Sequence, residues 1–206
     1  MIENLVFDEE KHIYYINGKR KTSVSEILKI YDGIKYGGAN PRTMFEAAER
    51  GKRVHAFSER HDCDPDFNLD EELEANGDIN GYLIALLRFY AEYGNSFYAI
   101  EEPFYSAEFD YCCTVDRIRD MTDKATGITK QAIVDYKTSS KVLKLRNRFQ
   151  LTLYGIAVWG KANYKNYDYY IVHLQADGNF EVIKVEPMDL DEIERFIHLY
   201  WAIKKD

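Results

Sequence analysis

The chain has 206 residues, of which 46% are hydrophobic and 15% aromatic, and its formal net charge is -8. This composition suits one folded domain with a substantial core, and the acidic balance differs from the excess of lysine and arginine that is typical of nucleic-acid-binding proteins. No apolar run approaches the roughly 20 residues that span a bilayer, and the N-terminus lacks a signal-peptide pattern, so we expect a cytoplasmic protein without a membrane partner.

Three cysteines occur in the chain, at Cys63, Cys112 and Cys113. Two of them are adjacent, and adjacent residues of a strand point to opposite faces of the sheet. This small number predicts no disulfide framework, which agrees with a cytoplasmic location.

The first half of the chain predicts a hairpin followed by helices. Apolar residues and the turn-forming pair Asn17-Gly18 favour the hairpin. Ser23 followed by Glu26 forms a capping box, which is typical of the start of a helix. The predicted elements of this half are strands at 5–7 and 12–16, a short helix after Ser23, and helices at about 41–61 and 78–93.

One face of the helix predicted at 41–61 carries Met44, Ala48, Gly51 and His55. Their spacing follows the stripe with which a helix faces a core, so we expect His55 to point inward. A histidine in that position is either a ligand or a core residue hydrogen-bonded to a backbone carbonyl.

An acidic segment follows this helix, and four of its residues have the opening spacing of a calcium-binding loop. The rest of the loop pattern fails, because Phe67 stands where the sharp turn needs glycine and Leu73 stands where a bidentate glutamate is needed. We therefore interpret the segment as a solvated loop. Its four acidic residues are Asp62, Asp64, Asp66 and Asp70.

Three strands are predicted at about 97–106, 111–119 and 131–138, and the last two carry buried-looking charges. Asp135 and Lys137 lie two residues apart, so their side chains share one face of their strand. Two carboxylates on neighbouring strands, Asp116 and Asp135, can hold a hard divalent cation. The alternative is a simple Asp/Lys ion pair on a half-exposed strand.

The last quarter of the chain predicts a helix at about 147–160, strands at 168–175 and 180–185, and a final helix capped by Asp189 and Glu192. Gln150 and Tyr154 lie one turn apart on the buried face of the first of these helices. The chain thus predicts an α/β fold, with a mixed sheet flanked by helices. We expect one domain over 1–206, with a hairpin and helical region at about 1–95 and a catalytic core at about 96–206.

In this order the motifs resemble the PD-(D/E)xK nuclease superfamily, and within it the RecB-like branch, which includes CRISPR-associated RecB-like nucleases and phage exonucleases. The family pattern is G-x-x-x-H on a helix, G-x-x-D and (D/E)-x-K on adjacent strands, and Q-x-x-x-Y on the following helix. Cys113 stands where the second glycine is expected, and its small size makes it a tolerable replacement. The matching residues are Gly51 and His55, Asp116, Asp135 and Lys137, and Gln150 and Tyr154.

The resemblance implies a restriction-endonuclease-like core that binds Mg²⁺ or Mn²⁺. It implies the metal ligands His55, Asp116, Asp135 and the backbone carbonyl of Tyr136. Lys137 would orient or deprotonate the attacking water. Some RecB-like nucleases hold an iron–sulfur cluster through three C-terminal cysteines, but no cysteine follows Cys113 here, so we expect no cluster.

A further acid is suggested by Glu101-Glu102-Pro103-Phe104, which resembles the E-x-P-F segment that the family often shows. Glu101 is the better candidate of the two acids for a catalytic role, and an exposed strand carboxylate is the alternative.

Gln150 and Tyr154 would hold the DNA strand or order the site, and a packed aromatic is the alternative for Tyr154. The segment after Lys137 is basic and contains no acid, so it predicts phosphate contacts beside the site. The alternative is a solvated loop leading into a helix. The basic residues of this segment are Lys141, Lys144, Arg146 and Arg148.

The function implied by the resemblance is a metal-dependent DNA nuclease, and we expect an exonuclease on linear ends in recombination, repair or phage DNA metabolism. DNA is the expected partner, and a recombination or helicase partner and an oligomer are compatible with it. Two alternatives stay open, a structure-selective endonuclease and a non-catalytic member of the fold that binds nucleic acid or protein.

Overall fold

A computed structural model describes residues 4–36 and 40–205, and within them eight strands form one mixed sheet. The strand order is β1-β2-β3-β5-β6-β7-β8, with β4 paired to the other edge of β5. Neighbouring strands are antiparallel except for the β3–β5 and β6–β7 pairs. The strands are β1 (Leu5–Asp8), β2 (Ile13–Ile16), β3 (Lys19–Ser23), β4 (Ala99–Ser106), β5 (Tyr111–Thr122), β6 (Thr129–Lys137), β7 (Asp168–Leu174) and β8 (Phe180–Lys184).

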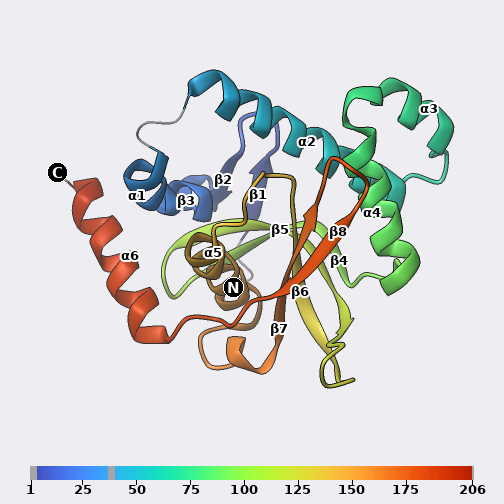
Figure 1. Cartoon of the computed structure of the whole chain (residues 1–206). Coiled ribbons are helices and arrows are strands. Elements are labelled where there is room, and N and C mark those ends of the chain that lie inside the picture. Colours follow the sequence, from blue (N-terminus) through green and yellow to red (C-terminus); the bar gives the residue numbers. More distant parts are fainter. Residues whose placement is uncertain (1–3, 37–39, 206) are drawn as a thin grey trace.

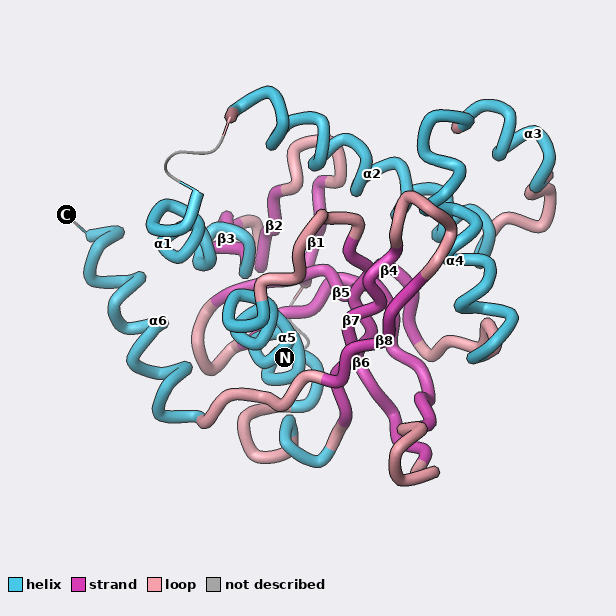
Figure 2. Tube along the Cα trace, viewed as in Figure 1, coloured by secondary structure: helices cyan, strands magenta, loops and turns pink. Residues whose placement is uncertain are grey.

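Helices cover both faces of this sheet. Figure 1 shows α5 and α6 on one side of the strands and α4 on the other, with α2 crossing the top of the view, and Figure 2 shows the strands at the centre. The helices are α1 (Val24–Tyr36), α2 (Pro41–Cys63), α3 (Leu69–Ala75), α4 (Asn80–Tyr93), α5 (Lys144–Trp159) and α6 (Leu190–Lys205), and short 3-10 turns lie at Gly77–Ile79 and Tyr164–Asn166. This arrangement confirms the predicted α/β class, with a mixed sheet flanked by helices.

Each face of the sheet has its own apolar core. One core joins the sheet to α1, α5 and α6, and the other joins it to α2 and α4. Cys113 belongs to the first of these cores, whereas Cys112 packs with Tyr14 and Ile16 of the N-terminal hairpin. The two adjacent cysteines therefore face opposite ways, as strand alternation predicts.

Local signals explain where the helices begin and end. The capping box before α1 is confirmed, because the Ser23 N–H donates to Glu26 Oε2 at 3.0 Å and the Glu26 N–H donates to Ser23 Oγ at 3.1 Å. Asn40 caps α2 by accepting from the Arg42 N–H at 2.9 Å, and Pro41 follows it at the first helical position. Gly160, with a φ of 76°, ends α5.

Several sequence expectations need correction. The turn at Asn17-Gly18 does not close the first hairpin but leads into an additional strand, β3, while the first hairpin turns at residues 9–12. The segment interpreted as a solvated loop begins with Asp62, which belongs to α2 and has a fully buried side chain, and ends in the first turn of the short helix α3. Residues 1–3, which entered the signal-peptide argument, lie outside the described residues. Within the described ranges, none of the helices combines the length and apolar character that crossing a membrane requires.

The stripe of α2 that was expected to face a core does not do so. Met44 is 46% exposed, and Ala48, Gly51 and His55 line an open cleft. The buried stripe of α2 is instead the neighbouring one, which contains Val54, Phe57 and Ser58. Residues at this helical spacing can equally well line the wall of a cleft, so the spacing alone could not distinguish a buried face from a cleft face.

A fork in the sheet determines where this cleft lies. Along one edge of β5, residues Tyr111 and Cys112 pair with β3, whereas β6 pairs only from Arg117 onward. Strand β4 occupies the opposite edge throughout. Residues 113–116 therefore lie where β3 and β6 separate. Backbone N–H and C=O groups at this point are not used in strand pairing along this edge, so side chains can form hydrogen bonds with them.

Candidate active site

Asp116 lies at the fork of the sheet, one residue before the pairing of β5 with β6 begins. Its carboxylate accepts a hydrogen bond from the Tyr136 N–H, with 2.8 Å between Asp116 Oδ2 and Tyr136 N. At the fork, the Tyr136 N–H of β6 is therefore free of strand pairing with β5 and binds the Asp116 carboxylate instead. The side chain is 9% exposed, so it is fixed at the cleft floor.

Glu101 lies opposite Asp116 on β4, where the regular ladder between β4 and β5 omits one pair. Its φ of 44° is unusual for a residue other than glycine inside a strand and costs about 1–3 kcal/mol. Glu101 Oε1 lies 3.1 Å from His55 Nδ1, and its side chain is 19% exposed. The alternative of an exposed strand carboxylate does not describe this residue.

His55 faces both carboxylates from α2. Its Nδ1 is 3.7 Å from Asp116 Oδ2 in addition to its contact with Glu101. One ligand atom from each of the three residues lies within 4.8 Å of the others, so these residues could hold a metal ion, and we call them the candidate metal-binding triad. The resemblance implied His55, Asp116 and Asp135 in such a set; the geometry groups the first two with Glu101, and Asp135 is not part of this group.

Asp135 and Lys137 both lie on β6, where Lys137 lines the same cleft and Asp135 is buried next to it. Lys137 Nζ is 2.6 Å from Asp135 Oδ2, and the Asp135 side chain is only 2% exposed. Oδ2 accepts no hydrogen bond of regular geometry, whereas Oδ1 accepts one from Gln150 Nε2 at 2.9 Å. Gln150 Nε2 is also 2.9 Å from the Tyr154 hydroxyl, so the helix motif orders the strand carboxylate directly.

The electrostatics of the site favour a bound cation. Burial raises the pKa of Asp116, although the nearby imidazole of His55 opposes this shift. Burial also raises the pKa of Asp135, although Lys137 opposes it. Carboxylates that are costly to ionise in isolation are stabilised by a divalent ion, and the set of carboxylate oxygens with one imidazole nitrogen suits Mn²⁺ and Mg²⁺. The residues present therefore fit the metal that the resemblance implies.

The pKa of His55 is raised in the metal-free protein. Withdrawal from water lowers it, but the carboxylates of Asp116 and Glu101 outweigh this effect and raise the pKa to about 9. Because this value exceeds the ordinary 6.5, the imidazolium stabilises the metal-free fold fully below pH 6.5, and the contribution is lost as the pH rises through about 9.

A metal ion must displace the His55 proton, because only neutral imidazole can be a ligand. We expect Mn²⁺ binding at pH 7 to release at least one proton and to tighten as the pH rises toward 9. Isothermal titration calorimetry in two buffers with different ionisation enthalpies measures the proton count. The His55→Gln variant is the control, since its release should be smaller by about one proton. Equal proton release by the wild type and this variant would contradict the assignment.

The cleft around these residues has a volume of about 680 Å³. Helix α2 forms one wall, and the tip of the N-terminal hairpin forms another with Phe7, His12 and Tyr14. Tyr14 ties that hairpin to the site, because its hydroxyl lies 2.7 Å from Thr114 Oγ1 on β5. Sequence analysis missed these hairpin residues, since nothing in a local pattern brings residues 7–14 beside residue 116.

The basic segment after β6 divides into different environments. Arg146 lines the cleft and pairs with Asp32, with 2.7 Å between Arg146 Nε and Asp32 Oδ1. Lys141 and Lys144 are exposed outside the cleft lining. Arg148 points elsewhere, because its Nε donates to the backbone carbonyl of Glu186 at 2.9 Å. The structure thus brings one of these four basic residues to the site.

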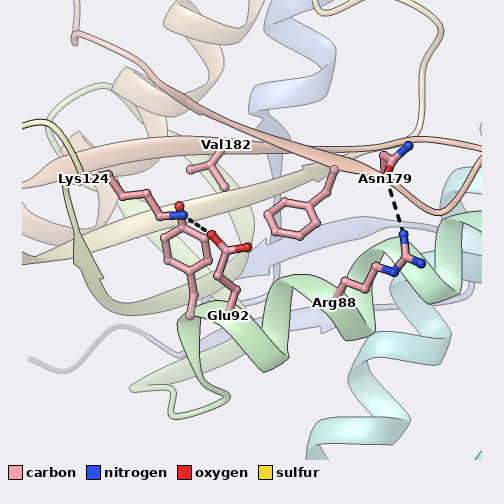
Figure 3. A pocket seen from close by; sticks show the side chains of 7 residues that line it. Arg88, Glu92, Lys124, Asn179 and Val182 are labelled. Carbon is pink, nitrogen blue, oxygen red and sulfur yellow. Dashed lines mark hydrogen bonds and ion pairs between the residues drawn. The ribbon is translucent and has the colours of Figure 1, made fainter.

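A second hollow of about 310 Å³ lies between α4 and the β7–β8 turn. Figure 3 shows that its charged side chains contact protein groups: Glu92 pairs with Lys124, and Arg88 extends toward Asn179. Arg88 Nη1 also donates to the Gly178 carbonyl at 2.9 Å. This hollow contains none of the motif residues.

Comparison with known proteins adds little to this description. No family model matches the chain, and no curated protein sequence matches it. A solved structure titled "Crystal structure of SSO0001" aligns over 89% of this chain and 76% of its own chain, with 13% sequence identity and a TM-score of 0.43.

Proposed function

We propose that this protein is a metal-dependent deoxyribonuclease with a restriction-endonuclease-like core, of the RecB-like branch of the PD-(D/E)xK superfamily. The observation that carries the proposal is that the motif residues converge at one cleft, which all of them line except Asp135, whose carboxylate contacts Lys137 and Gln150 of the lining. His55 comes from α2, Asp116 from β5, Asp135 and Lys137 from β6, and Gln150 and Tyr154 from α5. These residues are up to about 100 positions apart in the chain. The direct contacts that join them, His55 with Asp116, Asp135 with Lys137, and Gln150 with Asp135 and Tyr154, are hydrogen bonds or ion pairs.

The proposed metal ligands are His55, Asp116 and Asp135, together with the backbone carbonyl of Tyr136, and Glu101 is close enough to join them. A Mg²⁺ or Mn²⁺ ion held there would lower the pKa of a water molecule and balance charge on the scissile phosphate.

The chain's own residues supply the remaining roles. Lys137, 22% exposed at the cleft, is placed to hold the attacking water and to offset charge that grows on the phosphate oxygens. Gln150 fixes the Asp135 carboxylate through a buried hydrogen bond, and Tyr154 in turn contacts Gln150. Arg146 lines the cleft and is the member of the predicted basic segment that could contact a backbone phosphate there, although Asp32 neutralises part of its charge.

Digestion of end-labelled DNA tests the proposal. Linear single-stranded and double-stranded DNA are incubated beside a closed circle, with Mg²⁺, Mn²⁺ or a chelator, and the wild type is compared with the Asp135→Asn variant. We expect metal-dependent loss of linear DNA alone, which identifies an exonuclease, and no loss with the variant. Cleavage of the circle would indicate the endonuclease alternative. Binding without cleavage under either metal would refute the proposal in favour of a non-catalytic binding protein.

A further inference from the structure

Arg117 is the largest fully buried side chain of the described residues, and it follows Asp116 directly on β5. A buried guanidinium is costly unless all five of its N–H groups are satisfied. Here they are satisfied by protein groups alone. Nε and Nη2 donate to Asp62 Oδ2 at 2.9 and 2.7 Å, and Nη2 also donates to Ser58 Oγ at 2.9 Å. Nη1 donates to the Asp116 carbonyl at 2.6 Å and to Glu101 Oε1 at 3.3 Å.

These contacts connect the same three elements that supply the metal-binding triad. Ser58 and Asp62 lie on α2 one and two turns after His55, the carbonyl belongs to Asp116 on β5, and Glu101 lies on β4. Aromatic rings of Phe97 and Tyr136 lie 5.4 and 5.5 Å from the guanidinium carbon. The guanidinium is therefore held in one place and is in direct contact with all three elements.

The two carboxylates that contact Arg117 are bound unequally. Asp62, whose side chain is fully buried, receives two short hydrogen bonds, whereas Glu101 Oε1 receives one longer bond and also faces His55. Asp62 thus neutralises most of the guanidinium charge. Arg117 orients Glu101 through one long hydrogen bond of 3.3 Å, which leaves the Glu101 carboxylate able to bind a cation as well.

We propose that Arg117, with Asp62 as its counter-ion, is a positioning residue that holds Glu101 and the Asp116 backbone at the spacing of the metal-binding triad. The inference rests on the proposed metal-dependent function and assigns to the site a second layer of residues that no motif contains. Arg117 is fully buried, so its role is exerted through Glu101 and the Asp116 carbonyl, to which it donates hydrogen bonds.

The test compares Arg117→Lys with Arg119→Lys. Lysine keeps the charge but cannot reach Asp62, Ser58 and Glu101 at once, because its donors sit on one atom. Arg119 is a matched control, since it lies two residues further on the same strand, is also buried, and packs against Phe97. Its hydrogen bonds run to the backbone carbonyls of Tyr93, Gly94 and Asp120, away from the triad.

We measure the Mn²⁺ dissociation constant by calorimetry and cleavage as a function of Mn²⁺ concentration. Arg117→Lys should weaken Mn²⁺ binding by about 10–100-fold, the range found when residues that support metal ligands are replaced. Saturating Mn²⁺ should restore most of the cleavage rate. Arg119→Lys should lower the melting temperature while changing the Mn²⁺ dissociation constant by less than about twofold.

A second variant covers the case in which Arg117→Lys does not fold. Asp62→Asn keeps the shape of the counter-ion but removes its charge, so Arg117 should bind Glu101 more tightly and withdraw it from the metal. Mn²⁺ binding should again weaken. Wild-type affinity for Mn²⁺ in either folded variant would overturn the positioning role while leaving the proposed function intact. A wild-type protein that binds no Mn²⁺ would overturn both.

Discussion

The Asp116→Asn variant should lose DNA cleavage by about 10³-fold or more, because a neutral amide removes a charged metal ligand and each 1.4 kcal/mol of lost transition-state stabilisation is a factor of ten. The fold should survive the change. Asparagine keeps an oxygen that can accept the Tyr136 N–H bond now made by Asp116 Oδ2 at 2.8 Å. Steady-state cleavage of end-labelled DNA and thermal melting give the two readouts.

Melting temperature separates a ligand from a structural carboxylate. Burial raises the pKa of Asp116, so its charge opposes folding in the absence of a cation, and the metal-free variant should melt at or above the wild-type temperature. Added Mn²⁺ should raise the melting temperature of the wild type and not that of Asp116→Asn. Asp120→Asn is the control, since this exposed residue of the same strand contacts Tyr98 outside the cleft. If both variants lost cleavage equally, Asp116 would have no special role.

The Lys137→Met variant should cleave DNA about 10²–10³-fold more slowly, which is the loss found when one preorganised charge-stabilising donor is removed. Metal binding should not weaken in this variant. Lys137 Nζ now lies 2.6 Å from Asp135 Oδ2, and its removal leaves that carboxylate oxygen free for a cation. The measurement pairs single-turnover cleavage at saturating Mn²⁺ with calorimetric Mn²⁺ binding.

Lys130→Met provides the matched control for this change. Lys130 is an exposed lysine of the same strand, at the end of β6 that is remote from the fork. It should retain wild-type cleavage. A Lys137→Met protein that cleaved at the wild-type rate would reduce the Asp135–Lys137 contact to an ordinary ion pair, which was the alternative reading of the sequence.

The charges of the candidate site are balanced by groups of opposite sign. The proposed acidic ligands are accompanied by the proton of His55 and the guanidinium of Arg117. In the metal-free protein three positive groups, His55, Lys137 and Arg117, contact the acids of the cleft. A divalent cation would replace the positive charge contributed by His55, which explains why proton release is expected on binding. Arg117 is fully buried and stays in place, so it can hold the ligands in the same position before and after binding.

The sequence alone determined the features that depend on local periodicity. Side chains alternate along a strand, so Asp135 and Lys137 had to share a face; Lys137 lines the cleft, and the buried Asp135 contacts it at 2.6 Å. Residues four apart share a helix face, so Gln150 and Tyr154 had to meet, and they are hydrogen-bonded at 2.9 Å. The capping box before α1 and the strands that carry the acids were predicted for the same reason.

Only the tertiary structure decided which of these faces meet, because long-range strand pairing leaves no local pattern. The fork between β3 and β6 placed Asp116 beside the Tyr136 N–H, and an irregular backbone at Glu101 turned a strand carboxylate toward His55. The packing of α2 against the sheet buried Asp62, which had been interpreted as part of a solvated loop, against Arg117 of β5. A charge in a sequence is exposed or buried according to the partner that covers it, and that partner lies 55 residues away in this chain.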